Sequence, residues 1–221
     1  MAKTTKPKRL QAAEAVPNPQ ARQSARAAQP RGKGDEILDA ALEEFSANGF
    51  AATRLDDVAK RAGVAKGTIY FYFKDKEELF ERLLHSYMSP LVDALESRIT
   101  GEAPARVVLE TMVDVFDREV LQTRRKDILR LIISEGPRFP RIAEAYYRNV
   151  LSRVQAVMRR ALAGAVERGE ISKSFVEFPQ LVFAPALVSV VWKSMFDRFQ
   201  PLDGKKLMLA HIGVIFGDRG K

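Results

Sequence analysis

The sequence contains no cysteine and only two histidines, His85 and His211. Without cysteine there can be no disulfide scaffold, no thiol nucleophile and no thiolate metal site. Neither histidine has a second histidine at ligand spacing, so we expect no metal site. The sequence also lacks a glycine-rich phosphate loop, a Ser-His-Asp arrangement and an HExxH motif. We therefore predict that the protein is not an enzyme and uses no cofactor.

Long apolar runs are also missing. The longest nearly unbroken one, residues 181–192, contains Pro185 and is followed by Lys193, whereas a membrane-spanning helix needs about 20 apolar residues. The N-terminal region has no apolar segment of the kind found in secretory signals. We therefore expect a soluble, cytoplasmic protein without membrane contact, and the absence of cysteine fits a reducing compartment.

The formal net charge of +8 is concentrated in the first 33 of the 221 residues. That segment holds eight basic residues and one acidic residue, so the rest of the chain sums to only +1. Four prolines interrupt it and it has few large apolar side chains, which predicts a disordered basic tail at residues 1–33. The tail either adds nonspecific attraction to a polyanion or is a plain solvated extension. Nucleic-acid binding by the folded part must be argued from local arrangement.

From Gly34 onward the apolar residues recur with helical spacing, which predicts an all-α fold. The first predicted helix, residues 35–48, stops at Gly49, and a second short helix opens at Thr53 through a Thr-x-x-Asp box with Asp56. A third helix covers residues 66–73, and a long fourth helix runs from Asp75 to about residue 100. Further helices are predicted at residues 104–121, 126–135, 140–168, 179–199 and 205–216, with Pro185 expected to kink or delay the helix that contains it.

Residues 53–73 have the spacing of a helix-turn-helix motif. Two short helices joined by about three residues must cross steeply, which requires a small side chain at the contact and a turn residue that tolerates positive φ. Ala59 and Gly63 meet these two requirements. The alternative is a helical hairpin from an ordinary bundle, but such hairpins pack nearly antiparallel through longer apolar stripes.

With Ile69 and Phe73 directed inward, the third helix leaves lysine, threonine and tyrosine side chains outside. We predict that this surface binds DNA, because a helix fits the major groove and these side chains can reach base edges and phosphate oxygens. Lys76 adds a cation beside the first N–H groups of the fourth helix, where it is placed to clamp a phosphate. Residues 53–76 carry six basic and three acidic side chains, a net charge of +3.

The run from Thr53 to Phe80 includes Gly-Val-Ala-Lys-Gly-Thr-Ile-Tyr-Phe-Tyr-Phe-Lys-Asp-Lys-Glu-Glu-Leu, and it resembles the N-terminal DNA-binding domain of TetR-family transcriptional regulators. The resemblance covers about residues 35–82 and implies that the matching positions lie at or near the DNA. It also implies that Thr53 caps the preceding helix and can touch a phosphate. Tyr72 stands where many members have histidine. The predicted DNA-binding residues are Thr53, Arg54, Lys66, Gly67, Thr68, Tyr70, Tyr72 and Lys76.

The same resemblance implies a helical C-terminal domain that binds a small effector and forms a homodimer through its last two long helices, here about residues 177–199 and 205–216. The first of these has more apolar residues than one monomer's core requires, which agrees with burial by a partner, although a fully internal helix is the alternative. Aromatic and methionine side chains at helical spacing can line a cavity or form ordinary core. The candidate effector-pocket residues are Met112, Phe116, Tyr146, Val150, Phe183 and Trp192.

These features together predict an N-terminal three-helix DNA-binding domain at residues 34–80, joined by the long fourth helix to an effector-binding and dimerisation domain at residues 81–221. The predicted function is sequence-specific transcriptional regulation, as a repressor released from a double-stranded DNA operator by an unknown small molecule. The alternative is a nonspecific architectural DNA-binding protein that relies on the basic tail. Removal of residues 1–33 distinguishes the two functions. A sequence-specific regulator keeps its preference for its operator sequence, whereas a protein that binds through the tail loses nearly all of its affinity for DNA.

Overall fold

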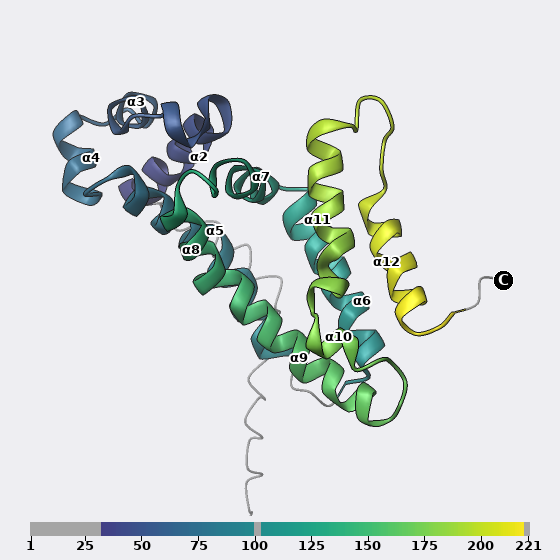
Figure 1. The fold of residues 1–221 in the computed structure, drawn as a ribbon. Helices are drawn as coiled ribbons and strands as arrows, with labels where there is room; N and C mark the ends of the chain where they lie inside the picture. Colours follow the sequence, from purple (N-terminus) through teal and green to yellow (C-terminus); the bar gives the residue numbers. More distant parts are fainter. Residues whose placement is uncertain (1–31, 100–102, 219–221) are drawn as a thin grey trace, which may run out of the picture.

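The computed structural model describes residues 32–99 and 103–218, and every regular element in these two ranges is a helix (Figure 1). The prediction of an all-α fold is confirmed. The predicted tail at residues 1–33 lies outside the described residues, except for its last two. In the described ranges, no helix combines the length and the apolar character needed to cross a bilayer.

The N-terminal part contains the predicted series of three helices and a long fourth one. Gly49 has a φ of 77°, as expected for a helix stop, but a short helical turn follows it, so that the first helix continues with a kink at this glycine. The elements are α2 (Lys33–Ala52), α3 (Leu55–Arg61), α4 (Lys66–Tyr72) and α5 (Lys76–Arg98).

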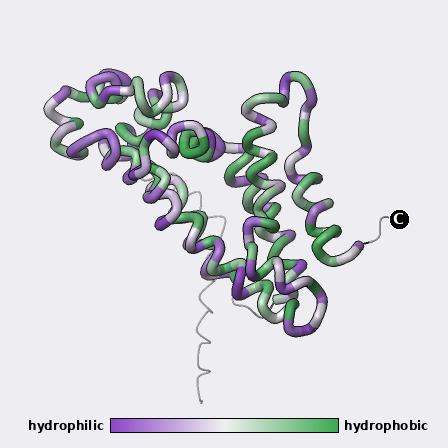
Figure 2. Tube along the Cα trace, in the orientation of Figure 1, coloured by the Kyte–Doolittle hydropathy of each residue, from purple (hydrophilic) through white to green (hydrophobic). Residues whose placement is uncertain are grey.

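Three phenylalanines form the centre of the N-terminal core. Phe45, Phe50 and Phe80 are fully buried, and their ring centroids lie 5.3–5.9 Å apart in tilted and edge-to-face pairs. Apolar residues recur along each helix instead of gathering in one segment, as Figure 2 shows. Each helix therefore contributes apolar side chains to the core.

The C-terminal part follows the predicted helices closely, with two additions. The segments predicted at residues 104–121 and 140–168 each contain a π-helical turn, and a short helix precedes the predicted helix at 179–199. Pro185 does not delay that helix, which begins at Gln180. The elements are α6 (Ala105–Phe116), η1 (Asp117–Leu121), α7 (Arg125–Glu135), α8 (Pro140–Tyr146), η2 (Tyr147–Leu151), α9 (Ser152–Glu167), α10 (Ser174–Glu177), α11 (Gln180–Met195) and α12 (Gly204–Ile215).

Among the described residues, α5 and α7 make the main links between the N-terminal helices and the rest of the chain, and the Phe139 ring just before α8 also packs on Phe50, with centroids 4.8 Å apart. Helix α5 does so as the sequence predicts, since it packs on α2 at its start and continues into the second part (Figure 1). Helix α7 lies against α2. At this contact Arg124 Nη1 is 3.3 Å from Glu43 Oε1, and Arg130 donates a hydrogen bond of 3.4 Å to the carbonyl oxygen of Ser46.

Candidate DNA-binding surface

The turn between α3 and α4 sets the position of α4. Gly63 has a φ of 63°, and the N–H of Val64 donates a 3.0 Å hydrogen bond to the carbonyl oxygen of Ala59. Val58 and Ala59 are buried at the contact between the two helices. The small residue and the left-handed glycine lie where the sequence predicts them, and the helix-turn-helix arrangement is confirmed.

The outer face of α4 is free of packing against the described part of the chain. Ile69 and Phe73 point into the core, whereas Lys66, Gly67, Tyr70 and Tyr72 are exposed and Thr68 is half-buried. A Cβ atom added at Gly67 would have no described atom within 4 Å, and this glycine has no positive φ. Packing and backbone geometry therefore do not require glycine here, whereas the close approach of a partner would.

Phe71 is part of this surface, although the predicted set omits it. Its side chain is 84% exposed, and its ring meets that of Tyr72 edge-to-face with centroids 5.5 Å apart. A helix rotates by about 100° per residue, so Phe71 lies opposite Ile69 and on the same side as Gly67. The inward direction of Ile69, which the sequence did reveal, is the signal that could have identified Phe71.

Asp56 of α3 organises two of the predicted contact residues. Its carboxylate accepts a hydrogen bond of 2.7 Å from Lys66 Nζ and one of 3.4 Å from the Tyr70 hydroxyl. The hydrogen bond from Lys66 lowers the pKa of Asp56, and the same bond raises the pKa of Lys66. The nearby charge of Arg54, which is itself exposed, opposes the rise at Lys66. All these groups lie at the surface, where solvent screens their interaction.

The structure corrects one of the predicted roles of Thr53, the box that opens the following helix. This residue is buried, and its hydroxyl donates hydrogen bonds to the carbonyl oxygens of Gly49 (2.7 Å) and Glu44 (3.3 Å). Helix α3 begins after Arg54, which makes no side-chain capping bond, so the predicted Thr-x-x-Asp box is wrong. Thr53 satisfies carbonyl groups at the end of α2, the helix that precedes it, so its predicted capping of the preceding helix is confirmed, whereas its contact with a phosphate stays a prediction.

Lys76 also differs from the prediction. Its ammonium group donates to the carbonyl oxygens of Phe50 (2.6 Å) and Ala51 (3.0 Å) and lies 4.7 Å from the centroid of the Phe50 ring. Burial lowers the pKa of Lys76. The side chain therefore caps the C-terminal end of α2 and does not extend outward as a phosphate clamp.

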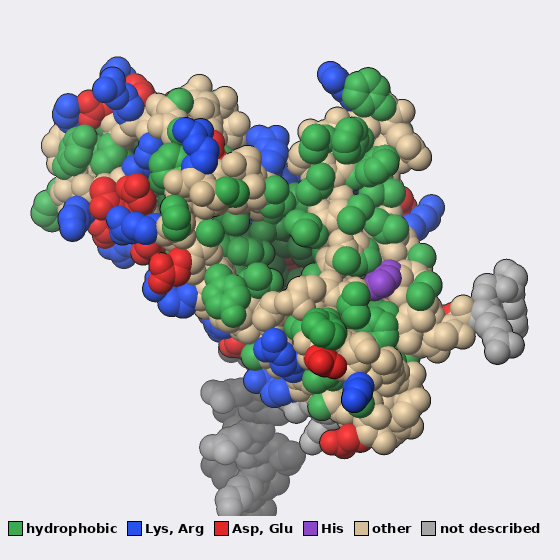
Figure 3. All heavy atoms as spheres, viewed as in Figure 1, with side chains coloured by type: hydrophobic (Ala, Val, Ile, Leu, Met, Phe, Trp, Pro, Cys, Tyr) green, Lys and Arg blue, Asp and Glu red, His purple; other side chains and the backbone are tan. Residues whose placement is uncertain are grey.

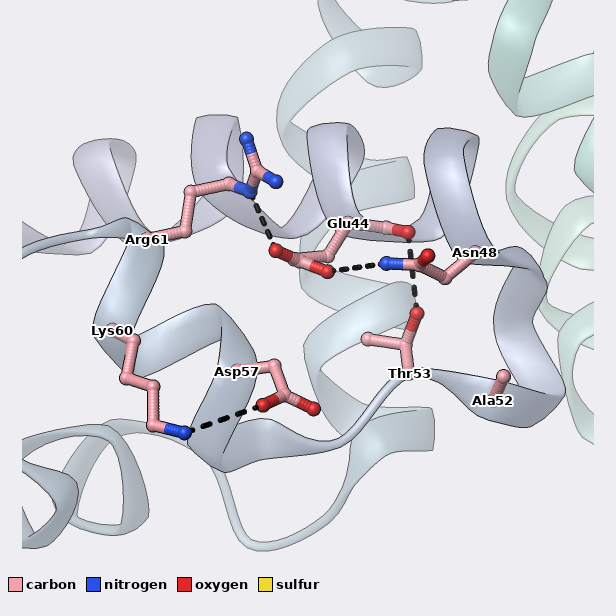
Figure 4. A pocket seen from close by; sticks show the side chains of 7 residues that line it. All are labelled: Glu44, Asn48, Ala52, Thr53, Asp57, Lys60 and Arg61. Carbon is pink, nitrogen blue, oxygen red and sulfur yellow. Dashed lines mark hydrogen bonds and ion pairs between the residues drawn. The ribbon is translucent and has the colours of Figure 1, made fainter.

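A polar network between α2 and α3 fixes these two helices against each other (Figure 4). Arg61 Nε donates to Glu44 Oε1 at 2.6 Å, and Asn48 donates to the other oxygen of Glu44 at 2.7 Å. A second contact joins Arg61 to Glu43 at 3.1 Å, and these two carboxylates raise the pKa of Arg61. Glu44 is buried, so its charge requires these partners.

An apolar cavity of about 610 Å³ lies in the C-terminal part of the chain. Figure 3 shows hydrophobic side chains gathered in the hollow at the centre of this face. Five of the six candidate pocket residues line the cavity, namely Met112, Phe116, Tyr146, Val150 and Phe183. Trp192 does not line it, because its indole N–H donates to the carbonyl oxygen of Gln200 (2.7 Å) and its ring packs on Phe196.

A short exposed helix held by a tight turn on a three-helix core, followed by a larger helical domain, defines a helix-turn-helix protein of the regulatory class. The model for "Bacterial regulatory proteins, tetR family" matches residues 37–83, and that for "Tetracyclin repressor-like, C-terminal domain" matches residues 105–203. The chain belongs to the TetR family of bacterial regulatory proteins.

Two curated relatives are HTH-type transcriptional regulators whose own function is uncharacterized. YvdT of Bacillus subtilis (strain 168) is 32% identical over 106 residues, which are 48% of this chain and 54% of YvdT. TtgW of Pseudomonas putida is 31% identical over 110 residues, 50% of this chain and 79% of TtgW. The chain spans about half the length of the first curated relatives that it matches.

Solved structures share the fold over most of the chain. The transcriptional regulator FadR of Bacillus subtilis, in complex with stearoyl-CoA, has a TM-score of 0.65 and 22% sequence identity, and the alignment covers 84% of this chain and 99% of FadR. FadR of Bacillus halodurans has a TM-score of 0.67 and 23% identity, with coverage of 87% and 100%. At this identity the likeness shows a common fold.

Proposed function

We propose that this chain is a sequence-specific, DNA-binding transcriptional repressor whose helix α4 enters the major groove. The observation that carries the proposal is the outer face of α4, which combines an ammonium group, three aromatic side chains and a glycine with open space around it. Exposed aromatic residues are costly in water unless a partner covers them. Residues 34–80 form the proposed reader domain, and a chromosomal operator implies action in the cytoplasm.

The test is a gel shift with the DNA that flanks the protein's own gene, followed by selection of bound fragments from random DNA. Tyr70→Ala should fold normally and lose at least tenfold in affinity, whereas Lys126→Ala, on the exposed side of α7, should bind like the wild type. Normal operator binding by a folded Tyr70→Ala protein would refute the assignment of the surface.

The second copy in the proposed homodimer packs on α11 and α12, at the far end of the molecule from α4 (Figure 1). The two helices approach closely, because a Cβ atom at Gly204 would meet Ser189 Oγ at 2.8 Å, and His211 Nε2 is 2.7 Å from the carbonyl oxygen of Leu181. Large apolar side chains stay exposed on this pair, which favours burial by a partner. They are Leu181, Leu187, Val188, Met195, Leu209 and Val214.

Sedimentation tests this interface. Val214 is 73% exposed on α12, and Val214→Glu should yield a monomer with weak operator binding. Val107 is 50% exposed on α6, and Val107→Glu serves as the matched control that stays dimeric. A dimer would place two α4 helices about 34 Å apart for a near-palindromic operator. A Val214→Glu protein that remains dimeric would rule out this face.

The proposed effector site is the apolar cavity in residues 81–221, which is lined in part by α5 and α7. Both helices also contact α2, so a molecule that widens the cavity must shift one helix or the other relative to the reader domain. The complex of FadR with stearoyl-CoA supports binding of a small molecule in this fold. Release of the operator in the gel shift on adding the effector is the expected result.

A further inference from the structure

The chemistry of the cavity limits what it can hold. Its volume of about 610 Å³ falls in the range of sites for small organic ligands. Of the described residues that line it, none is acidic, basic or a histidine. A charged group inside would give up its hydration without gaining a counter-ion, and this costs far more than burial of a neutral group.

Gln155 is the exception among the buried residues of this apolar lining. It lies on α9, is only 7% exposed as a residue and lines the cavity, and its amide is not among the enclosed, unpartnered side-chain atoms of the described residues, which are Ser46 Oγ and Glu135 Oε2. Buried amides in native proteins nearly always have a partner. The amide of Gln155 therefore opens onto the cavity, where a molecule that occupies the cavity can pair with it.

Tyr146 provides a second polar group in the same cavity. Burial raises the pKa of its phenol to about 12, and its hydroxyl has no hydrogen-bond partner in the described part of the chain. The neutral phenol is therefore available as a donor and an acceptor. Both groups lie inside, whereas Tyr147, which also lines the cavity, is more than half exposed and marks its opening.

The π-helical turn η2 explains why these two polar residues share one cavity. Gln155 lies nine positions after Tyr146, and in an uninterrupted α-helix residues nine positions apart lie on opposite faces. The extra residue that a π-helical turn accommodates rotates the two segments by about 100° relative to each other. The turn lies between them, at Tyr147–Leu151, and so brings both side chains toward the cavity.

We propose that the cavity binds a neutral, mainly apolar small molecule through one hydroxyl, carbonyl or amide group that pairs with Gln155, and that it excludes carboxylate and ammonium groups. Such a molecule would be the effector, so this inference rests on the proposed function. A neutral hydroxyl can accept from and donate to the glutamine amide, which satisfies both sides of the pair. An anionic head group would have to stay outside the opening.

The test uses the full chain and displacement of the neutral fluorescent probe N-phenyl-1-naphthylamine at pH 8. The competitors share one chain length and are 1-decanol, decanoate and decyltrimethylammonium. We expect 1-decanol to displace the probe at a concentration at least tenfold lower than either ion. Equal or stronger displacement by decanoate would overturn the proposal.

Gln155→Leu tests the role of the amide. We expect its affinity for 1-decanol to fall about fivefold, while Gln180→Leu, at an exposed residue of the lining, changes it less than twofold. In the absence of ligand the Tm of Gln155→Leu should equal or exceed that of the wild type, because leucine matches the apolar side chains that line the cavity around this position. An unchanged affinity for 1-decanol, or a lowered Tm, would refute the assignment.

Failure of the proposed function has a different signature. If 1-decanol binds through Gln155 but operator DNA is neither bound nor released in the gel shift, the ligand site stands and the regulatory role falls. If the operator binds normally but decanoate displaces the probe best, the regulatory role stands and the ligand class is wrong.

Discussion

Replacement of Lys76 by methionine separates a structural role from a DNA-binding one. Methionine keeps most of the apolar stem beside Phe50 and removes the ammonium group that donates to the carbonyl oxygens of Phe50 and Ala51. A hydrogen bond from a charged donor contributes about 1.5–3 kcal/mol, and a cation–π contact about 0.5–1 kcal/mol at an exposed site. The ammonium is only partly buried, so water replaces part of this stabilisation.

We therefore expect Lys76→Met to lower the free energy of unfolding by about 1–2 kcal/mol. For a chain of this size that corresponds to a fall in Tm of about 2–8 °C. Lys126→Met, at an exposed lysine of α7, is the control and should leave the Tm within about 1 °C. Urea and thermal unfolding must be compared at one protein concentration, because association of two chains also stabilises them.

The salt dependence of operator binding provides the second measurement. Removal of one lysine–phosphate interaction makes the slope of log K against log salt concentration less negative by about 0.9. Because Lys76 faces the end of α2, we expect the slope of Lys76→Met to match that of the wild type. A slope change near 0.9 without a fall in Tm would refute the capping role and restore the phosphate clamp that the sequence suggests.

Four further experiments test the proposed reader domain and its link to the rest of the chain. Gly67→Ala should raise the free energy of unfolding by about 0.4–1 kcal/mol, since the backbone tolerates alanine, yet weaken operator binding at least tenfold in a gel shift. Phe71→Ser should leave the Tm unchanged, because the ring is exposed, and weaken the same binding. Lys66 lowers the pKa of Asp56, so the contribution of this pair to stability is complete above the ordinary pKa of 3.8 and is lost as the pH falls through the lower pKa of the folded state. An NMR titration of the Asp56 carboxyl group should show the lowered pKa, and Lys66→Met should raise it. A double-mutant cycle of Glu43→Gln and Arg124→Gln should yield a coupling energy of about 0.2–1 kcal/mol, and zero coupling would remove this contact as a link between α2 and α7.

Helical periodicity was sufficient to predict most elements of this fold. Ile69 and Phe73 are one turn apart and both buried, and Gly63 takes the positive φ that a short interhelical turn needs. These features depend on neighbours within a few residues. Because Ile69 and Phe73 point inward, the other side chains of α4 were predicted to lie outside, although Phe71 was omitted from that set.

The errors arise where a side chain's partner is distant in the sequence. The ammonium of Lys76 reaches carbonyl groups 25 and 26 residues earlier, which only the packing of α5 on α2 brings within range. Thr53 fits a capping box by spacing, but the kink at Gly49 offers its hydroxyl a carbonyl acceptor at the end of α2 instead. The π-helical turns have no comparable sequence signal, and one of them determines which side chains face the cavity.

The contacts of α7 suggest that the reader is controlled through two helices and not through α5 alone. Leu129, Ile132 and Ile133 of α7 line the cavity, while Arg130 of the same helix contacts α2 at Ser46. If α5 tilted while α7 stayed in place, α2 could not keep its packing contacts with both helices. Since α2 also holds α3 through Glu44 and Arg61, we expect a ligand in the cavity to displace α5 and α7 together and to carry the proposed reader domain as a unit.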